Sequence, residues 1–137
     1  MGLFDVFKSE PLKLTPRLTL AVSLLFMMSA DGEIEEEEIG QLQSVLGDDA
    51  DLIDMAIKYV RSHTFDQYLI EAPALLTVDQ KTCLMINVCD SLLSDGVAAE
   101  AEQKMFHLML GAMGISQEDF RTHFQTIALK NNRNIFK

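Results

Sequence analysis

The stretch LTLAVSLLFMMSADGEIEEEE, residues 18–38, joins a long apolar run to a cluster of carboxylates. Its first 13 residues are almost entirely apolar, but a membrane span needs about 20, so we expect a helix buried in a protein core. Asp31-Gly32 should end that helix, because glycine adopts the left-handed conformation at little cost. The carboxylates that follow suit the first turn of a second helix, where the helix dipole tolerates negative charge.

The rest of the chain also reads as helix, because no alternating strand pattern persists and proline occurs only at positions 11, 16 and 73. Thr15-Pro16 is a typical helix start, and the Thr77 to Gln80 stretch has the form of a capping box. We therefore predict an all-α fold, a compact bundle of about seven helices. The expected helices cover residues 16–30, 35–46, 48–63, 65–71, 78–94, 99–113 and 117–130.

One helical domain over residues 15–130 accounts for this pattern, with an N-terminal segment before it (1–14) and a loosely ordered basic tail after it (131–137). Val45 and Phe124 are among the apolar residues that the helical spacing turns inward. Cys83 and Cys89 lie six residues apart, a spacing that puts them on different helix faces. We interpret both as small core residues in a reducing compartment.

The charge of the chain is strongly acidic. Eleven basic against 21 acidic residues give a formal net charge of −10, which argues against nucleic acid and favours cations or a protein partner with a basic surface. Ten acids fall between Asp31 and Asp54, and no Lys or Arg occurs from Leu18 to Ile57. A solvated acidic face is the simplest explanation of such a run.

The acidic turn occurs twice. At an offset of 64 residues, Asp31-Gly32 aligns with Asp95-Gly96, and Glu38 aligns with Glu102. Each copy is an apolar helix, an Asp-Gly turn and an amphipathic helix. Two copies of one hairpin predict a pseudo-twofold bundle rather than a solenoid, which needs about three or more repeats.

The two turns suggest a metal site. Each Asp follows the C-terminal end of a helix, where the dipole disfavours an anion, and each Glu lies about one turn into the next helix. A divalent cation held by oxygen ligands would compensate Asp31, Glu38, Asp95 and Glu102 if the hairpins pack symmetrically. The ion could be calcium, magnesium, manganese or zinc, and Glu35 and Glu36 would add to the local field. The alternative is that the turns merely stop helices.

Other site types fit less well. An EF-hand loop would place Met27 and Ser29 at its first two ligand positions, where oxygen ligands from carboxylates are required. The sequence has no Glu-x-x-His pair, no glycine-rich phosphate loop and no Cys-His zinc spacing. Nothing joins a nucleophile to a base, so we do not expect an enzyme. A carboxylate–metal hydrolase remains a third alternative, which requires an open cleft.

Three motifs resemble the tellurite-resistance TerB-like family: SADGEIEEEE (29–38), DSLLSDGVAAEAEQKMFHLML (90–110) and GISQEDF (114–120). The resemblance covers roughly residues 15–130. It implies an all-helical bundle with internal pseudosymmetry and a metal site at Asp31, Glu38, Asp95 and Glu102. The second motif departs from the first, because Val97-Ala98-Ala99 replaces Glu33-Ile34-Glu35, which implies a weaker second half-site.

These observations lead to one functional expectation. The chain is a non-enzymatic, cytoplasmic domain that binds a divalent cation and acts as an adaptor or sensor in a stress response. Tellurite resistance, protein partners and peripheral membrane association through such a partner are what the family resemblance implies. The alternative is a metal-independent interaction module that uses its acidic face; the oligomeric state is left open.

Overall fold

The computed structural model describes residues 12–30, 36–94 and 98–137. Over these residues the chain forms seven α-helices and two short 3-10 helices, with no strand, as the sequence predicts. The elements are α1 (Pro16–Met28), α2 (Glu36–Leu46), α3 (Ala50–Ser62), α4 (Phe65–Glu71), η2 (Pro73–Leu75), α5 (Val78–Leu93), α6 (Glu100–Ala112), α7 (Gln117–Asn131) and η3 (Arg133–Phe136).

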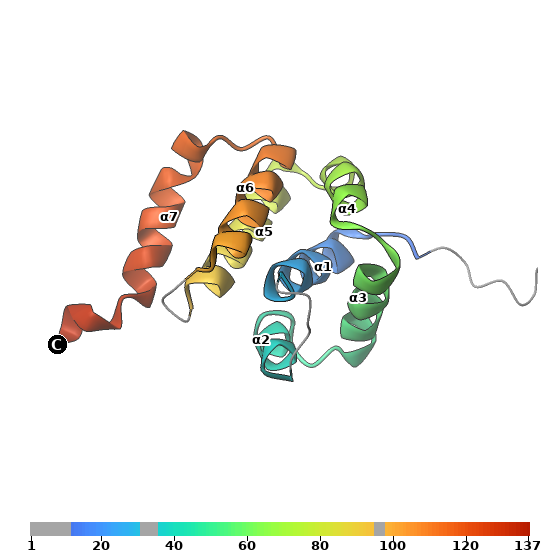
Figure 1. Cartoon of the computed structure of the whole chain (residues 1–137), viewed down its shortest axis with the longest axis horizontal. Helices are drawn as coiled ribbons and strands as arrows, with labels where there is room; N and C mark the ends of the chain where they lie inside the picture. Colours follow the sequence, from blue (N-terminus) through green and yellow to red (C-terminus); the bar gives the residue numbers. More distant parts are fainter. Residues whose placement is uncertain (1–11, 31–35, 95–97) are drawn as a thin grey trace, which may run out of the picture.

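Helix α1 is the centre of the molecule. Thr15 caps it as predicted, since its side chain accepts a hydrogen bond from the Leu18 N–H at 3.2 Å, and Pro16 fits the first turn. Nine of its 13 residues are buried. A helix without a polar face needs cover on all sides, and α2, α3, α5 and α6 all pack against it (Figure 1).

The second half of the bundle repeats the first. Helix α5 contacts both α6 and α7, as α1 contacts both α2 and α3. Helices α2 and α6 begin at Glu36 and Glu100, which keeps the 64-residue offset of the sequence repeat. Helix α4 lies between the halves in sequence and packs on α6 (Figure 1). The helices therefore form two matching sets around the α1–α5 pair.

Among the described residues, every buried side-chain hydroxyl has a hydrogen-bond partner. The Ser23 hydroxyl donates to the Thr19 carbonyl at 2.6 Å, so the Tyr68 hydroxyl must donate to Ser23. Between α3 and α4, the Tyr59 hydroxyl donates to Glu71 Oε2 at 2.6 Å. Burial raises the pKa of Tyr68 above its ordinary value, and the Ser23 bond only partly offsets this. Both tyrosines are therefore neutral hydrogen-bond donors in the core.

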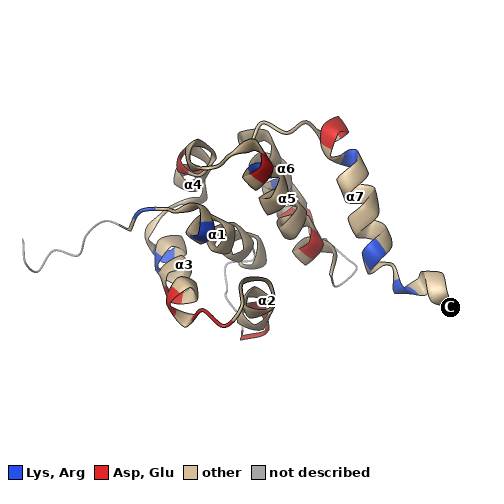
Figure 2. Ribbon diagram, turned by 180° about the vertical axis from the view of Figure 1, so that it is seen from behind, with Lys and Arg blue, Asp and Glu red and all other residues tan. Residues whose placement is uncertain are grey.

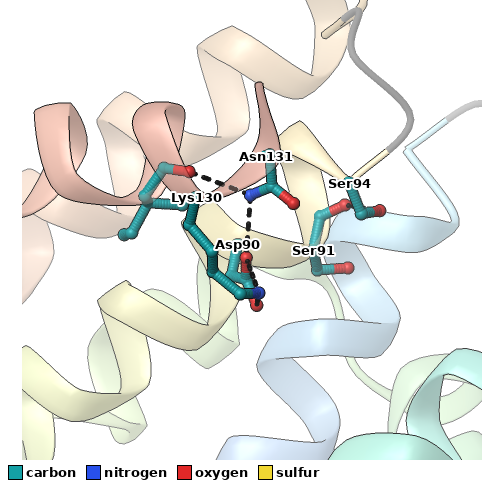
Figure 3. A network of polar contacts seen from close by, with 6 residues as sticks. Asp90, Ser91, Ser94, Lys130 and Asn131 are labelled. Atoms are coloured by element: carbon teal, nitrogen blue, oxygen red, sulfur yellow. Dashed lines mark hydrogen bonds and ion pairs between the residues drawn. The ribbon is translucent and has the colours of Figure 1, made fainter. Parts of the chain in front are cut away.

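A polar contact joins α5 to α7. Asp90 receives hydrogen bonds from Lys130 Nζ at 2.8 and 2.9 Å and from Asn131 Nδ2 at 2.9 Å (Figure 3). Partial burial of Asp90 opposes its ionisation, but these bonds and the charge of Lys130 outweigh it and hold the pKa of the carboxyl below its ordinary value. Burial, with a smaller effect of Asp90, raises the pKa of the neighbouring Cys89 thiol to about 11.

Several predicted details are wrong. Val45 and Phe124 are 41% and 43% exposed instead of inward, because α2 and α7 each pack on one neighbour along a narrow stripe. Cys89 is buried as predicted, but Cys83 is exposed on the outer face of α5. Residues Arg133–Phe136 of the tail form η3 rather than loose chain.

Two helices end at the glycines that the sequence indicates as helix stops. Gly47 and Gly114 follow α2 and α6 with φ of 78° and 72°, the left-handed conformation. The Asp31-Gly32 and Asp95-Gly96 turns lie outside the described residues. Among the helices that the structure does describe, none combines the length and the apolar character needed to cross a bilayer.

Replacing Ser23 should lower the free energy of unfolding more than replacing Tyr68, its hydrogen-bond partner. Ser23→Ala leaves the Tyr68 hydroxyl buried without an acceptor, so the free energy of unfolding should fall by about 1–3 kcal/mol. Tyr68→Phe leaves Ser23 bonded to the Thr19 carbonyl and should cost about 1 kcal/mol or less. Urea denaturation measures both; a larger loss in Tyr68→Phe contradicts this account of the hydroxyl directions.

Asp90 should contribute to stability in a pH-dependent way. Because its pKa is lowered on folding, the contribution is present at neutral pH and is lost as pH falls below about 4 through the folded pKa. Asp90→Asn should lower the free energy of unfolding by about 0.5–1 kcal/mol at pH 7, and this difference from wild type should shrink as the pH falls below about 4. Asp54→Asn, an exposed carboxylate on α3, is the control; a difference from wild type that does not shrink at acidic pH sinks the idea.

Candidate metal centre

Glu38 and Glu102, which the internal repeat aligns, both line one small hollow in the described structure. It has a volume of about 180 Å³ and lies where α1 and α5 end and α2 and α6 begin. We call it the acidic hollow, and its lining residues are Met27, Met28, Glu37, Glu38, Gln41, Ser91, Leu92 and Glu102.

The lining is paired between the halves. Glu38 and Glu102 both line the hollow, and they are the two glutamates that the 64-residue offset aligns. Met28 and Leu92 form a second aligned pair in the last turns of α1 and α5. The hollow therefore lies between the two halves of the repeat. Asp31 and Asp95, the other two predicted ligands, lie outside the described residues.

Glu102 has a structural role that the motif did not reveal. It is the third residue of α6, and its Oε1 accepts a hydrogen bond from the Ala99 N–H at 3.1 Å. Ala99 has no side-chain acceptor, so this bond is half of a capping box. One carboxylate oxygen of Glu102 is thereby committed to the helix start, and Oε2 has no such partner among the described residues.

Glu38 occupies the matching position, the third residue of α2, behind Glu36 and Glu37. These three carboxylates in one first turn are favourable for the helix dipole but repel one another. Glu36 and Glu37 are exposed, whereas Glu38 is half-buried beside the ends of α1 and α5. Acidic side chains are therefore concentrated where the two halves of the repeat meet.

Three polar or acidic residues of the lining were not predicted as site residues. Gln41 follows Glu37 by four residues on α2, so helical spacing alone puts both on one face. Ser91 lies four residues before Asp95, near the C-terminal end of α5. The pattern i, i+4 around each motif was the signal that could have identified Glu37, Gln41 and Ser91.

The polar side chains of the lining all offer oxygen, although the thioethers of Met27 and Met28 line the hollow as well. Carboxylates, one amide and one hydroxyl supply hard oxygen ligands, which suit calcium, magnesium and manganese better than zinc. No His or Cys lines the hollow. Within residues 12–30, 36–94 and 98–137, no three His, Cys, Asp or Glu side chains are grouped closely enough to hold an ion. The described residues by themselves therefore do not make up a metal site.

Histidine and cysteine lie elsewhere. His63 stacks on Tyr59 with ring centroids 4.0 Å apart, and Cys83 lines a different, mainly apolar pocket beside Pro16 and Arg17. Neither residue lines the acidic hollow. Comparison with models of protein families, with curated proteins and with solved structures finds no match for this chain.

The capping bond of Glu102 gives a direct test of its structural role. Glu102→Gln keeps an acceptor for the Ala99 N–H and should leave the free energy of unfolding within about 0.5 kcal/mol of wild type. Glu102→Ala loses that acceptor and should cost about 1 kcal/mol. Thermal and urea unfolding, without added metal, measure both variants. Equal losses in Gln and Ala variants show that the bond does not stabilise α6.

Proposed function

We propose that the domain binds one hard divalent cation at the acidic hollow and acts without catalysis, as an adaptor or sensor. The observation that carries the proposal is that Glu38 and Glu102, one from each repeat, line the same small space. In a chain with a net charge of −10, carboxylates brought to one spot repel one another, and a divalent cation bound there would reduce that repulsion.

The cation would tie the two halves together. Glu38 begins α2 and Glu102 begins α6, while the other walls come from the ends of α1 and α5. Ligands from both hairpins would make ion binding sensitive to how the halves sit against each other. That property suits a sensor, and the TerB-like resemblance points to a stress response such as tellurite resistance. Magnesium, calcium and manganese are favoured over zinc by the oxygen ligands.

A second candidate function is a metal-independent interaction module. Glu36, Glu37, Asp48, Asp51 and Asp54 are all exposed on the α2–α3 side of the bundle. Figure 2 shows acidic residues from α2 through the connecting loop to the start of α3, and no Lys or Arg lies between them in the sequence. Val45 and Met55 add exposed apolar area on the same two helices. Such a face fits a protein partner with a basic surface.

Calorimetric titration with calcium, magnesium, manganese and zinc separates the two functions. We expect saturable binding of at least one hard ion, and an affinity about tenfold weaker in Glu38→Gln and in Glu102→Gln, because each removes one negative ligand. Glu102→Gln is the informative variant, since it keeps the helix cap while removing the charge.

Glu100→Gln is the matched control, because Glu100 lies in the same first turn of α6 but does not line the hollow. Its affinity should stay within about twofold of wild type, the scale of a screened surface charge. Equal weakening in Glu100→Gln and Glu102→Gln means that the ion senses only the overall charge. Absence of saturable heat with all four ions rules out the metal function and leaves the interaction module.

A further inference from the structure

A second, larger pocket lies between α6 and α7. Its volume is about 440 Å³, within the range of about 300–1,000 Å³ typical of small-molecule sites. We call it the α6–α7 pocket. Its lining residues are Leu92, Leu93 and Ala98, then Gln103, Phe106, His107 and Leu110 of α6, and Gln117, Phe120, Arg121 and Phe124 of α7.

The two helices line this pocket with the same spacing. On each helix the lining residues follow the pattern i, i+3, i+4, i+7, which is one continuous helix face. Both faces are directed at the same space, and the end of α5 closes it from below. Helices α6 and α7 each pack on α5 more closely than on one another, which leaves the space between them.

The bottom of the pocket is apolar. Phe106 and Phe120 are buried, with ring centroids 5.6 Å apart, and Leu110 is buried beside them. Phe124 forms a side wall and is 43% exposed, so an occupant of the pocket would cover apolar surface that is now in water. The exposure of Phe124 that contradicted the sequence prediction is thus explained by the open pocket.

The mouth of the pocket is polar and carries no acid. Gln103 and His107 of α6 face Gln117 and Arg121 of α7, and Gln117 Nε2 lies 3.2 Å from His107 Nδ1. All four side chains are exposed at the rim. Over the described part of the chain, Arg121 takes part in neither of the ion pairs found there. The only formal charge in the lining is therefore a guanidinium without an ion-pair partner among those residues.

The fold alone does not require a positive charge at this position. Arg121 follows the cap Ser116 by five residues, and on α3 the residue five after the cap Asp49 is Asp54. Counted from the helix caps, the charge sign is thus opposite at these two positions. Figure 2 shows acid in the first turn of α7 and base beyond it.

We infer that the α6–α7 pocket binds a small amphipathic carboxylate of the fatty-acid class. The apolar chain would lie against Phe106, Phe120 and Phe124, and the carboxylate would accept hydrogen bonds from Arg121 at the mouth. The overall charge of −10 repels anions, so only a local contact can favour a carboxylate over an ammonium head. A preference for a carboxylate over an ammonium head group would therefore indicate binding at this pocket.

This pocket is separate from the acidic hollow, with which it shares only Leu92. The two proposals can fail independently. Calorimetry with monomeric decanoate, decanol and decylamine at about 0.15 M salt tests the pocket, because the Debye length is then about 8 Å and distant charges are largely screened. We expect saturable binding, with the highest affinity for decanoate, a lower affinity for decanol and the lowest for decylamine.

Two variants locate the binding. Arg121→Gln should weaken the binding of decanoate about two- to fivefold and leave the affinity for decanol unchanged. Arg133→Gln removes the same charge outside the pocket and should change neither affinity. Phe124→Ala should weaken all three ligands about fivefold or more, and Leu129→Ala, an exposed apolar residue of α7 outside the pocket, should not. The inference is overturned if no ligand binds, or if the three head groups bind equally well. It is also overturned if each variant and its control reduce the affinity equally.

Discussion

The burial of α1 is the constraint on which the rest of the structure depends. A helix with nine buried residues out of 13 has no side to offer to water, so four other helices must cover it. Its polar residues are accommodated without breaking the core: Thr19 and Ser23 bond to carbonyls one turn earlier, and Ser23 also accepts from Tyr68. That last bond ties α4 to α1 and helps to set the path of the chain between the two halves.

The same constraint brings Glu38 and Glu102 to one place. Because α1 and α5 pack directly on each other, their C-terminal turns lie close, and α2 and α6 start from the same end of the bundle (Figure 1). Glu38 and Glu102 occupy the third position of their helices and both line the shared hollow, and Glu102 also accepts the Ala99 N–H at the start of α6. Structural capping and cation binding are compatible, since a carboxylate has two oxygens.

Much of this fold was predictable because its signals are local. The caps at Thr15, Asp49, Thr77 and Ser116 and the apolar periodicity of α5 depend only on neighbouring residues. The errors depend on partners that the sequence does not show. Phe124 and Cys83 have core-like chemistry but face an open pocket and solvent, and the buried Tyr59 and Tyr68 were not anticipated. For the site, the offset of 64 predicted that Glu38 and Glu102 share a space, but the bond to Ala99 required a defined helix start.

The central claim is that one ion contacts both halves of the repeat at once. Paramagnetic broadening by manganese in an amide NMR spectrum tests it most directly. The account predicts that signals of Met28 and Glu38 from the first half, and of Leu92 and Glu102 from the second, broaden together at the same substoichiometric manganese concentration. Broadening confined to one half, or spread over the exposed acids of α2 and α3, would contradict it.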